Sequence, residues 1–238
     1  MAQLLTLIPP LLSLGTPLIW AATNLEQLAG NLEADLWQLS LRSLLLALAA
    51  AVLAVVTALL LAIAKRWSEA RWLQSLTFLA GMGYAVPGTV LALALLLTGG
   101  PWQLAPLVLL LWGYGDRFLA VAKGGLDAAL ERISPSLDEA ATGMGFNWQQ
   151  VLQRVHLPLL RGPLTVGLLL VFVDTVKELP LTFALRPFDF DTLSVRVYQY
   201  ASDERLAEAL LPALMILVLG LVASMALVPS LDQASSKG

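Results

Sequence analysis

Long apolar segments separated by short polar ones dominate this chain of 238 residues. Residues 43–64 carry no charge and are rich in leucine and alanine. As a helix they would be about 33 Å long at 1.5 Å per residue, which matches a bilayer hydrocarbon core about 30 Å thick. This segment is therefore predicted to be a membrane-spanning helix.

The same pattern predicts about six such helices. An uncharged run from Trp72 to Gly115 is divided by the turn sequence Thr-Gly-Gly-Pro at residues 98–101, so it should make two crossings joined by a very short loop. The first segment begins apolar, without a basic region or a cleavage site, and is expected to be a retained span that Pro9 and Pro10 bend or break. The predicted spans are residues 4–22, 43–64, 74–98, 101–121, 162–185 and 206–228.

Composition supports a membrane protein. Hydrophobic residues make up 58% of the chain and charged residues only 13%, against roughly a quarter charged in a typical soluble domain. A net charge of −3 offers no basic surface, so nucleic-acid binding is excluded as a function. Without cysteine and with a single histidine, no metal site is expected. We expect one all-α domain over residues 1–238, a polytopic bundle of transmembrane helices.

Basic residues indicate how the bundle is oriented. With the N-terminus in the cytoplasm, nine basic residues fall inside and four outside, as the positive-inside rule favours. The inner ones are Lys65, Arg66, Arg71, Arg117, Lys123, Arg132, Arg154, Arg161 and Lys237, and the outer ones are Arg42, Arg186, Arg196 and Arg205. This orientation makes the polar segment 123–160 a cytoplasmic loop.

Two short helices are predicted in the cytoplasmic loop. Ser136 and Glu139 form a capping-box sequence, so a helix should begin at Ser136, and Gly145 can adopt the left-handed conformation that ends it. Asn147 should cap a second, amphipathic helix that Pro158 closes. The expected product is a helical hairpin with a glycine bend, lying outside the bilayer.

This hairpin resembles the EAA loop of permease subunits of binding-protein-dependent ABC importers. The family pattern is E-A-A, three residues, G, nine residues, I, one residue, L-P, and six of its seven fixed positions match, with valine replacing isoleucine at the seventh. The six matching residues are Glu139, Ala140, Ala141, Gly145, Leu157 and Pro158, and Val155 is the seventh position. The resemblance implies a type I importer permease fold, in which this loop is a coupling helix that docks on a separate ATP-binding subunit. That partner would bind ATP and magnesium, and the chain itself would be non-catalytic and bind no cofactor. The alternative is an ordinary amphipathic surface hairpin.

Further stretches are similar to the C-terminal half of ferric iron permeases. They are residues 83–93, 117–122, 132–141, 177–182, 186–193, 195–199 and 201–209. Members of that family usually carry two such halves in one long chain, whereas this sequence has a single EAA loop. The resemblance therefore implies a second permease half, identical or not, and a periplasmic or extracellular binding protein, in a bacterial inner (plasma) membrane. The segment from Arg186 to Arg205 is either a docking surface for that binding protein or a solvated loop.

Gly83, Pro87 and Gly88 predict a kink inside the third span. Proline removes a backbone donor, and glycine lets neighbouring backbones approach closely. The kink is interpreted either as a gate hinge of the transport pathway or as a packing feature.

Three ionisable residues in the fifth span are the other candidates for transport. Asp174, Lys177 and Glu178 can share one helical face, where ionisable groups are costly unless they are paired or face water. They predict either an internal ion pair or a carboxylate that faces the pathway. Ferric iron prefers oxygen ligands, and the chain has too few clustered carboxylates for a tight cage. This shortage fits an importer whose external binding protein holds the metal.

Three other functions fit parts of the sequence. An ABC permease for thiamine, sulfate or a polyamine would share the EAA loop. An ion-coupled secondary transporter would use Asp174, Lys177 and Glu178 as a relay but would leave the loop unexplained, and an assembly or scaffold protein would explain neither group. No nucleophile, base and phosphate-binding glycine loop come together, so no active site is expected.

Overall fold

The computed structural model of the chain describes residues 2–24, 35–68 and 70–235. Its elements are α1 (Ala2–Thr23), α3 (Leu36–Trp67), α4 (Arg71–Ala80), η1 (Gly83–Ala85), α5 (Gly88–Gly99), η2 (Gly100–Trp102), α6 (Pro106–Glu131), α7 (Pro135–Gly143), α8 (Trp148–Val151), η3 (Leu152–His156), α9 (Leu157–Val176), α10 (Pro180–Leu185), α11 (Leu193–Ser202) and α12 (Leu206–Ser235). No strand occurs among these described residues, and the expected all-α fold class is confirmed.

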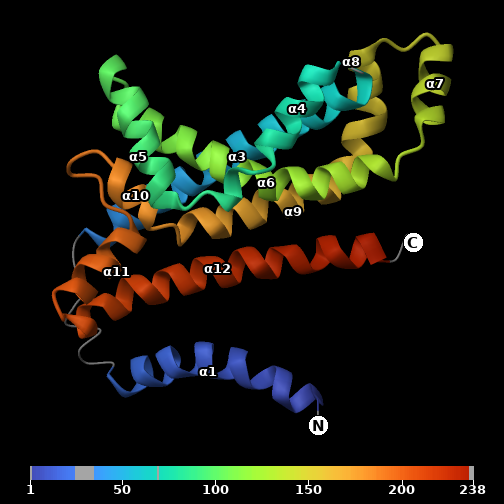
Figure 1. Cartoon of the computed structure of the whole chain (residues 1–238). Helices are drawn as coiled ribbons and strands as arrows, with labels where there is room; N and C mark the ends of the chain where they lie inside the picture. The colour runs from blue at the N-terminus through green and yellow to red at the C-terminus, as the bar shows by residue number, and fades with distance from the viewer. Residues whose placement is uncertain (1, 25–34, 69, 236–238) are drawn as a thin grey trace.

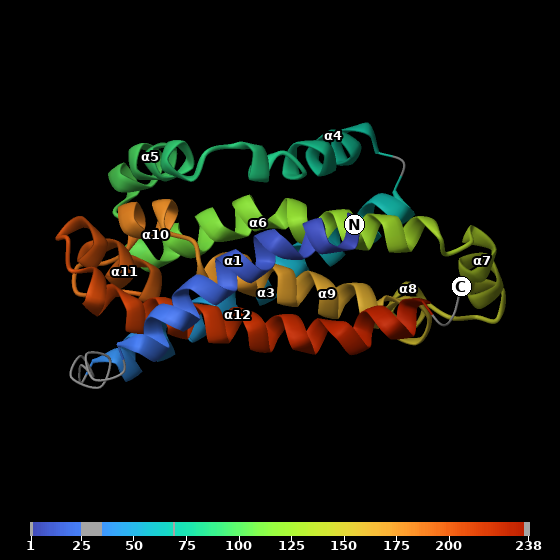
Figure 2. The same cartoon turned by 90° about the horizontal axis from the view of Figure 1, so that it is seen from below.

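Helices α3, α6 and α9 lie side by side and form the core of the bundle (Figures 1 and 2). One face of α3 consists of small residues at helical spacing, and Ala47, Ala50, Ala54 and Ala58 on it are fully buried. Small side chains let helix backbones approach closely, which is how helices pack when lipid supplies no hydrophobic driving force. The core helices therefore pack closely against one another through the small side chains of α3.

The ends of the bundle differ. Near their C-terminal ends, α3 and α6 are joined by a hydrogen bond from Arg66 to the Leu130 carbonyl, so the two helices run parallel. The α7–α8 hairpin lies at this end of the bundle, and α10 and α11 lie at the opposite end (Figure 1). Helix α12 packs on α9 and α11, and α1 contacts α12. Helix α1 curves and is continuous from Ala2 to Thr23, so of the expected bend or break at Pro9 and Pro10 the break does not occur (Figure 1).

Composition and length single out three membrane-spanning helices among the described residues. They are α3, the continuous helix from Trp148 to Val176, and Leu206–Ala226 of α12, and a bent pair of helices makes a fourth if it is counted as one span. Helix α6 carries five charged residues from Asp116 onward, which explains why composition alone does not select it. The count of six spans stays a prediction.

Two of the predicted spans are not single helices in the structure. The third, expected at 74–98, is split into α4 and α5 with a bend of 119° between them. The fifth, expected at 162–185, ends at Val176 and is followed by the separate short helix α10.

The sequence predicts that Pro158 ends the second helix of the hairpin, but in the structure the helix continues through this residue. The amide of Leu157 donates to the Leu152 carbonyl five residues back, and this wide π turn joins α8 to α9. Pro158 then occupies the first turn of α9, where a missing backbone donor costs little. The second helix of the hairpin and the following span therefore form one continuous helix.

Candidate functional site

The break between α4 and α5 is the first candidate site. Val86, which precedes Pro87, has an extended conformation with φ −79° and ψ 126°, as steric contact with a following proline favours. Gly83 lies directly on α6, where a Cβ atom would be only 2.2 Å from the Asp116 carbonyl oxygen. The expected kink is confirmed, and no larger residue fits at Gly83 without moving one of these segments.

Arg117 of α6 holds this break in place. Its Nη1 donates to the Val86 carbonyl oxygen at 2.7 Å, and its guanidinium carbon lies 5.5 Å from the centre of the Tyr84 ring. Backbone groups inside a membrane must find partners within the protein. The arginine therefore supplies a donor where the helix is interrupted.

Glu178 completes the junction from the other side. Its Oε2 lies 3.7 Å from Nε of Arg117, and its Oε1 accepts from the Leu181 amide at 3.3 Å. The side chain is nearly buried, and a Cβ atom on Gly88 would approach Oε1 to 3.0 Å. We name Gly83, Pro87, Gly88, Arg117 and Glu178 the helix-break junction.

The three ionisable residues predicted on one face are divided between two ion pairs. Asp174 and Lys177 pair at 2.8 Å at the end of α9, where the lysine is largely exposed. Glu178 turns away from both toward Arg117, because the helix ends at Val176 and the chain changes direction before α10. They do not form a continuous relay.

The α7–α8 hairpin, residues 134–158, is the second candidate site. Ser134, not Ser136, caps α7, and its side chain accepts from the Ser136 amide. Pro135 decides this start, because proline fits the first helical position and forces the preceding residue into an extended conformation. The predicted capping box with Glu139 is therefore wrong, and the Glu139 side chain is exposed.

The bend and the second cap of the hairpin have the predicted geometry. Gly145 has a φ of +86°, and the amide of Phe146 donates to the Ala141 carbonyl at 3.1 Å, a helix end that favours glycine. Asn147 and Gln150 exchange side-chain-to-backbone hydrogen bonds at 2.9 Å in a capping box. The local sequence thus specifies both turns.

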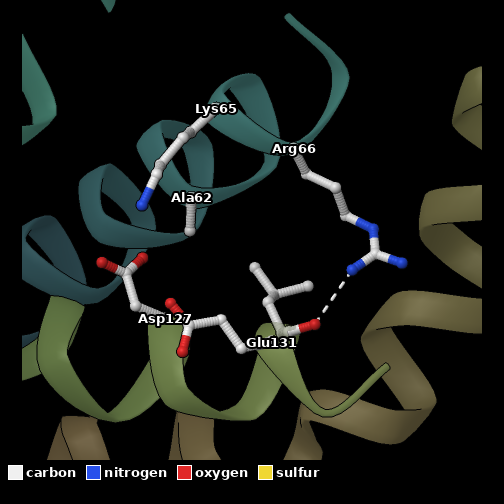
Figure 3. Close-up of a pocket in the computed structure, with 6 residues that line it drawn as sticks. Ala62, Lys65, Arg66, Asp127 and Glu131 are labelled. Carbon is white, nitrogen blue, oxygen red and sulfur yellow. Dashed lines mark hydrogen bonds between the residues drawn. The ribbon is translucent and has the colours of Figure 1, made fainter. Parts of the chain in front are cut away.

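Arg66 at the end of α3 anchors the hairpin. Its Nε lies 2.7 Å from the Asp138 carboxylate, and its terminal nitrogens donate to the carbonyls of Leu130 and Ile133 at 2.9 and 3.0 Å. Figure 3 shows Arg66 extending from α3 to the carbonyl at the end of α6, while Lys65 points toward the side of the pocket that holds Asp127. A cation is favoured there, because the C-terminal carbonyls of a helix carry partial negative charge.

His156 lies behind this contact and is fully buried. Its Nε2 is 3.0 Å from Asp138 Oδ1, and its ring stacks edge-on against Trp67 at a centroid distance of 5.7 Å. The helix 148–176 is about 43 Å long, more than a bilayer core requires, and Arg154 and Arg161 flank this residue, so we place it outside the span. Burial lowers the pKa of His156 despite the opposing influence of Asp138, and Arg66 lowers it further.

The residues of the EAA pattern fall on two sides of the hairpin. Glu139, Ala140, Gly145 and Pro158 are exposed, whereas Ala141 is buried against the body of the hairpin, and Val155 and Leu157 are partly buried. Some residues of the pattern therefore form the exposed surface of the hairpin, and the others pack beneath that surface and hold its shape.

Three residues of these sites were not identified from the sequence. Arg117 was interpreted only as a charge that orients the bundle, and its contacts with the helix break, about 16 Å along α6 from Pro106, were not predicted. No role was predicted for His156, and Arg66 was interpreted only as a charge that marks the cytoplasmic side. An arginine following an uncharged run, adjacent to Asp116, was the available signal for Arg117.

Solved structures share this fold at low sequence identity. A bacterial ABC transporter involved in the import of the acidic polysaccharide alginate aligns with a TM-score of 0.66 and 14% identity over 99% of this chain and 94% of that one. The MetNI methionine ABC transporter aligns with a TM-score of 0.61 and 17% identity over 82% of this chain and 95% of that one. These similarities support the fold alone.

Curated relatives share more of the sequence. The chain is 30% identical over 150 residues to Fe(3+)-transport system permease protein FbpB 2 of Haemophilus influenzae, covering 62% of this chain and 29% of that protein. It is 29% identical over 104 residues to the Ferric transport system permease protein FbpB of Actinobacillus pleuropneumoniae, covering 40% of this chain and 15% of that protein. The chain thus spans less than a third of each of these relatives.

The family comparison covers the second half of α3, all of α6 and α9, both candidate sites and most of α12. The model described as "Binding-protein-dependent transport system inner membrane component" matches residues 54–234, more than half of the chain. The chain therefore belongs to this family of inner-membrane components of binding-protein-dependent transport systems.

Proposed function

We propose that this chain forms half of the membrane pathway of an ATP-driven importer of ferric iron. The observation that carries the proposal is the hairpin, in which an exposed Glu139-Ala140 surface precedes a fixed bend at Gly145. In this proposal the hairpin docks on a separate ATP-binding subunit, which binds ATP and magnesium and hydrolyses the nucleotide. The permease itself converts the motion of that subunit into a change in the side of the membrane to which the pathway is open.

The surface of the hairpin supports a protein partner outside the bilayer. Leu137, Met144 and Trp148 expose 46%, 70% and 60% of their surface, beside the exposed Glu139. Exposed apolar side chains rimmed by polar ones are typical of interaction surfaces. Because Arg66 ties the hairpin to α3, movement of a docked partner would be transmitted to the core of the bundle.

Iron as the substrate is supported by the curated relatives, whose names state ferric transport. Among the described residues, no group of three or more histidine, cysteine or acidic side chains is placed to hold a metal ion. This arrangement suits a passage that does not retain its cargo, with tight binding left to the external binding protein. The surface from Arg186 to Arg205, at the end opposite the hairpin, is the proposed docking site of that protein.

The test is uptake of radiolabelled ferric iron by bacterial inner-membrane vesicles that contain the chain assembled with its ATP-binding subunit, binding protein and second permease half. We expect uptake to require ATP and to fall at least tenfold in Glu139→Arg, with the permease still inserted. Glu131→Arg is the matched control, because Glu131 is exposed at the same end of the bundle but lies outside the hairpin. Uptake driven by a proton gradient without ATP would overturn the mechanism, and ATP-driven uptake of thiamine, sulfate or a polyamine instead of iron would overturn the substrate.

A further inference from the structure

Asp116 lies within the predicted fourth span and has no counter-charge among the residues that the structure describes. It lies about 15 Å along α6 from Pro106, directly before Arg117. Its side chain makes no ion pair or hydrogen bond with any residue that the structure describes. The neighbouring charges differ in this respect, because Arg117 is paired with Glu178 and Lys177 with Asp174.

The carboxylate lies beside a groove at the helix break. Leu53 and Thr57 of α3, with Val108, Leu111, Trp112, Gly115 and Asp116 of α6, line this groove of about 430 Å³. A Cβ atom built on Gly83 would lie 3.5 Å from Oδ2 of Asp116, so the groove lies next to the bend between α4 and α5. Any change in that bend would alter the surroundings of the carboxylate.

An unpaired carboxylate at this depth does not face hydrocarbon, because the cost is several kcal/mol unless water or a partner charge is present. Two negative charges and one positive charge meet around the helix break: Asp116, Glu178 and Arg117. The surplus is negative and its ligand atoms are hard oxygens, which ferric iron prefers. A single carboxylate gives a contact that is weak enough to release its ion.

We propose that Asp116 lines the aqueous pathway at the helix break and makes a transient contact with the cationic cargo. The identity of that cargo rests on the proposed function, whereas the exposure of Asp116 to water in the pathway does not. The bend between α4 and α5 then controls access to this contact.

The first test uses the absence of cysteine from the chain. Asp116→Cys in the assembled importer is treated with a membrane-impermeant, cationic thiol reagent, and Val218→Cys is the control. Val218 lies about 18 Å along α12 from Leu206, at similar depth from the same end of the bundle, and is 55% exposed. We expect Asp116→Cys to react at least tenfold faster than the control. Equal, slow reaction of both variants would overturn the placement in the pathway.

The second test measures iron uptake by Asp116→Asn against Asp174→Asn, whose carboxylate pairs with an exposed lysine at the end of α9. We expect the maximal rate of Asp116→Asn to fall about tenfold, the concentration of loaded binding protein giving half-maximal uptake to stay unchanged, and Asp174→Asn to remain near wild type. A wild-type rate for Asp116→Asn would overturn the cargo contact. Absence of iron uptake by the wild-type importer would overturn the proposed substrate instead, while the thiol test would still decide the exposure of Asp116.

Discussion

Arg66 and Arg117 each join a long helix to a neighbouring segment of the chain, and the contacts of Arg66 are the tighter ones. Arg66 and Arg117 each extend from a long helix to carbonyl groups just before a proline, Pro135 or Pro87, and each meets a carboxylate. Arg66 is 2.7 Å from Asp138, whereas the ion pair of Arg117 is 3.7 Å long.

The number of backbone contacts differs in the same direction. Arg66 donates to the Leu130 carbonyl at the end of α6 and to the Ser134 carbonyl at the start of the hairpin, while Arg117 donates to the single carbonyl of Val86. Charge-assisted hydrogen bonds strengthen as they shorten. We infer that the hairpin is held as a rigid unit on α3, and that the helix break is held by contacts that a change of conformation can exchange.

The largest effect should come from filling the close contact at the helix break. In Gly83→Val, the new side chain would overlap the Asp116 carbonyl and force η1 away from α6, destabilising the permease by about 3 kcal/mol or more. The measurement is the thermal unfolding midpoint of the purified complex in detergent. Gly124→Ala is the control, since nothing lies within 4 Å of a Cβ atom there and alanine favours the helix. Equal midpoints for the two variants would contradict the close packing.

Removing the tighter arginine should release the hairpin. Arg66→Ala leaves Asp138 and the end of α6 without their cation, at a cost of about 3 kcal/mol. Limited proteolysis should then cleave residues 134–158 at least tenfold faster than in wild type, while Arg132→Ala, an exposed neighbour, leaves the rate unchanged. An unchanged rate in Arg66→Ala would mean that the hairpin is held by its apolar contacts alone.

Replacing the more loosely held arginine, Arg117, should destabilise the permease less than replacing Arg66, and it should leave the hairpin unaffected. Arg117→Gln leaves Glu178 without a counter-charge but keeps a donor for the Val86 carbonyl, so we expect a loss of about 2 kcal/mol in the free energy of unfolding. Proteolysis of the hairpin should stay at the wild-type rate. If Arg117→Gln loosened the hairpin as much as Arg66→Ala does, the two regions would not be independent.

A smaller effect is expected at the bend of the hairpin. Gly145→Ala forces a side chain into a φ of +86°, which costs about 1 kcal/mol, although the space around it is open. Gly143→Ala, two residues earlier within α7, has the same open space without the unusual φ and is the control. The comparison uses thermal unfolding midpoints. A loss in Gly143→Ala as large as in Gly145→Ala would argue against a conformational cause.

The smallest effect concerns pH at the hairpin anchor. Because the pKa of His156 is lowered in the folded chain, the unfolded chain binds the proton more readily, and stability is lost as the pH falls below the ordinary histidine value toward the folded one. The groups facing this ring are Asp138 of α7 and Arg66 of α3. The wild-type unfolding midpoint should fall between pH 7 and pH 5 by more than that of His156→Gln. Parallel pH curves for the two proteins would refute this assignment.

Local sequence was sufficient to predict the two turns of the hairpin. Gly145 and Asn147 act on backbone groups within a few residues, so their roles are readable without neighbours from elsewhere in the chain. The start of α7 was predicted at Ser136 instead of Pro135, also for a local reason. Proline favours the first position of a helix, and this preference prevails over the capping-box sequence that follows.

The apolar runs of the sequence by themselves determined a bundle of membrane helices, because each run must satisfy its own backbone in lipid. Only the tertiary structure decided which charges meet. Helical spacing placed Glu178 with Asp174 and Lys177, but α9 ends before it, and the side chain instead meets Arg117 from another helix. The same holds for His156, which is buried between α3 and α7. Spacing describes one helix face, whereas ion pairs between helices depend on where each helix stops.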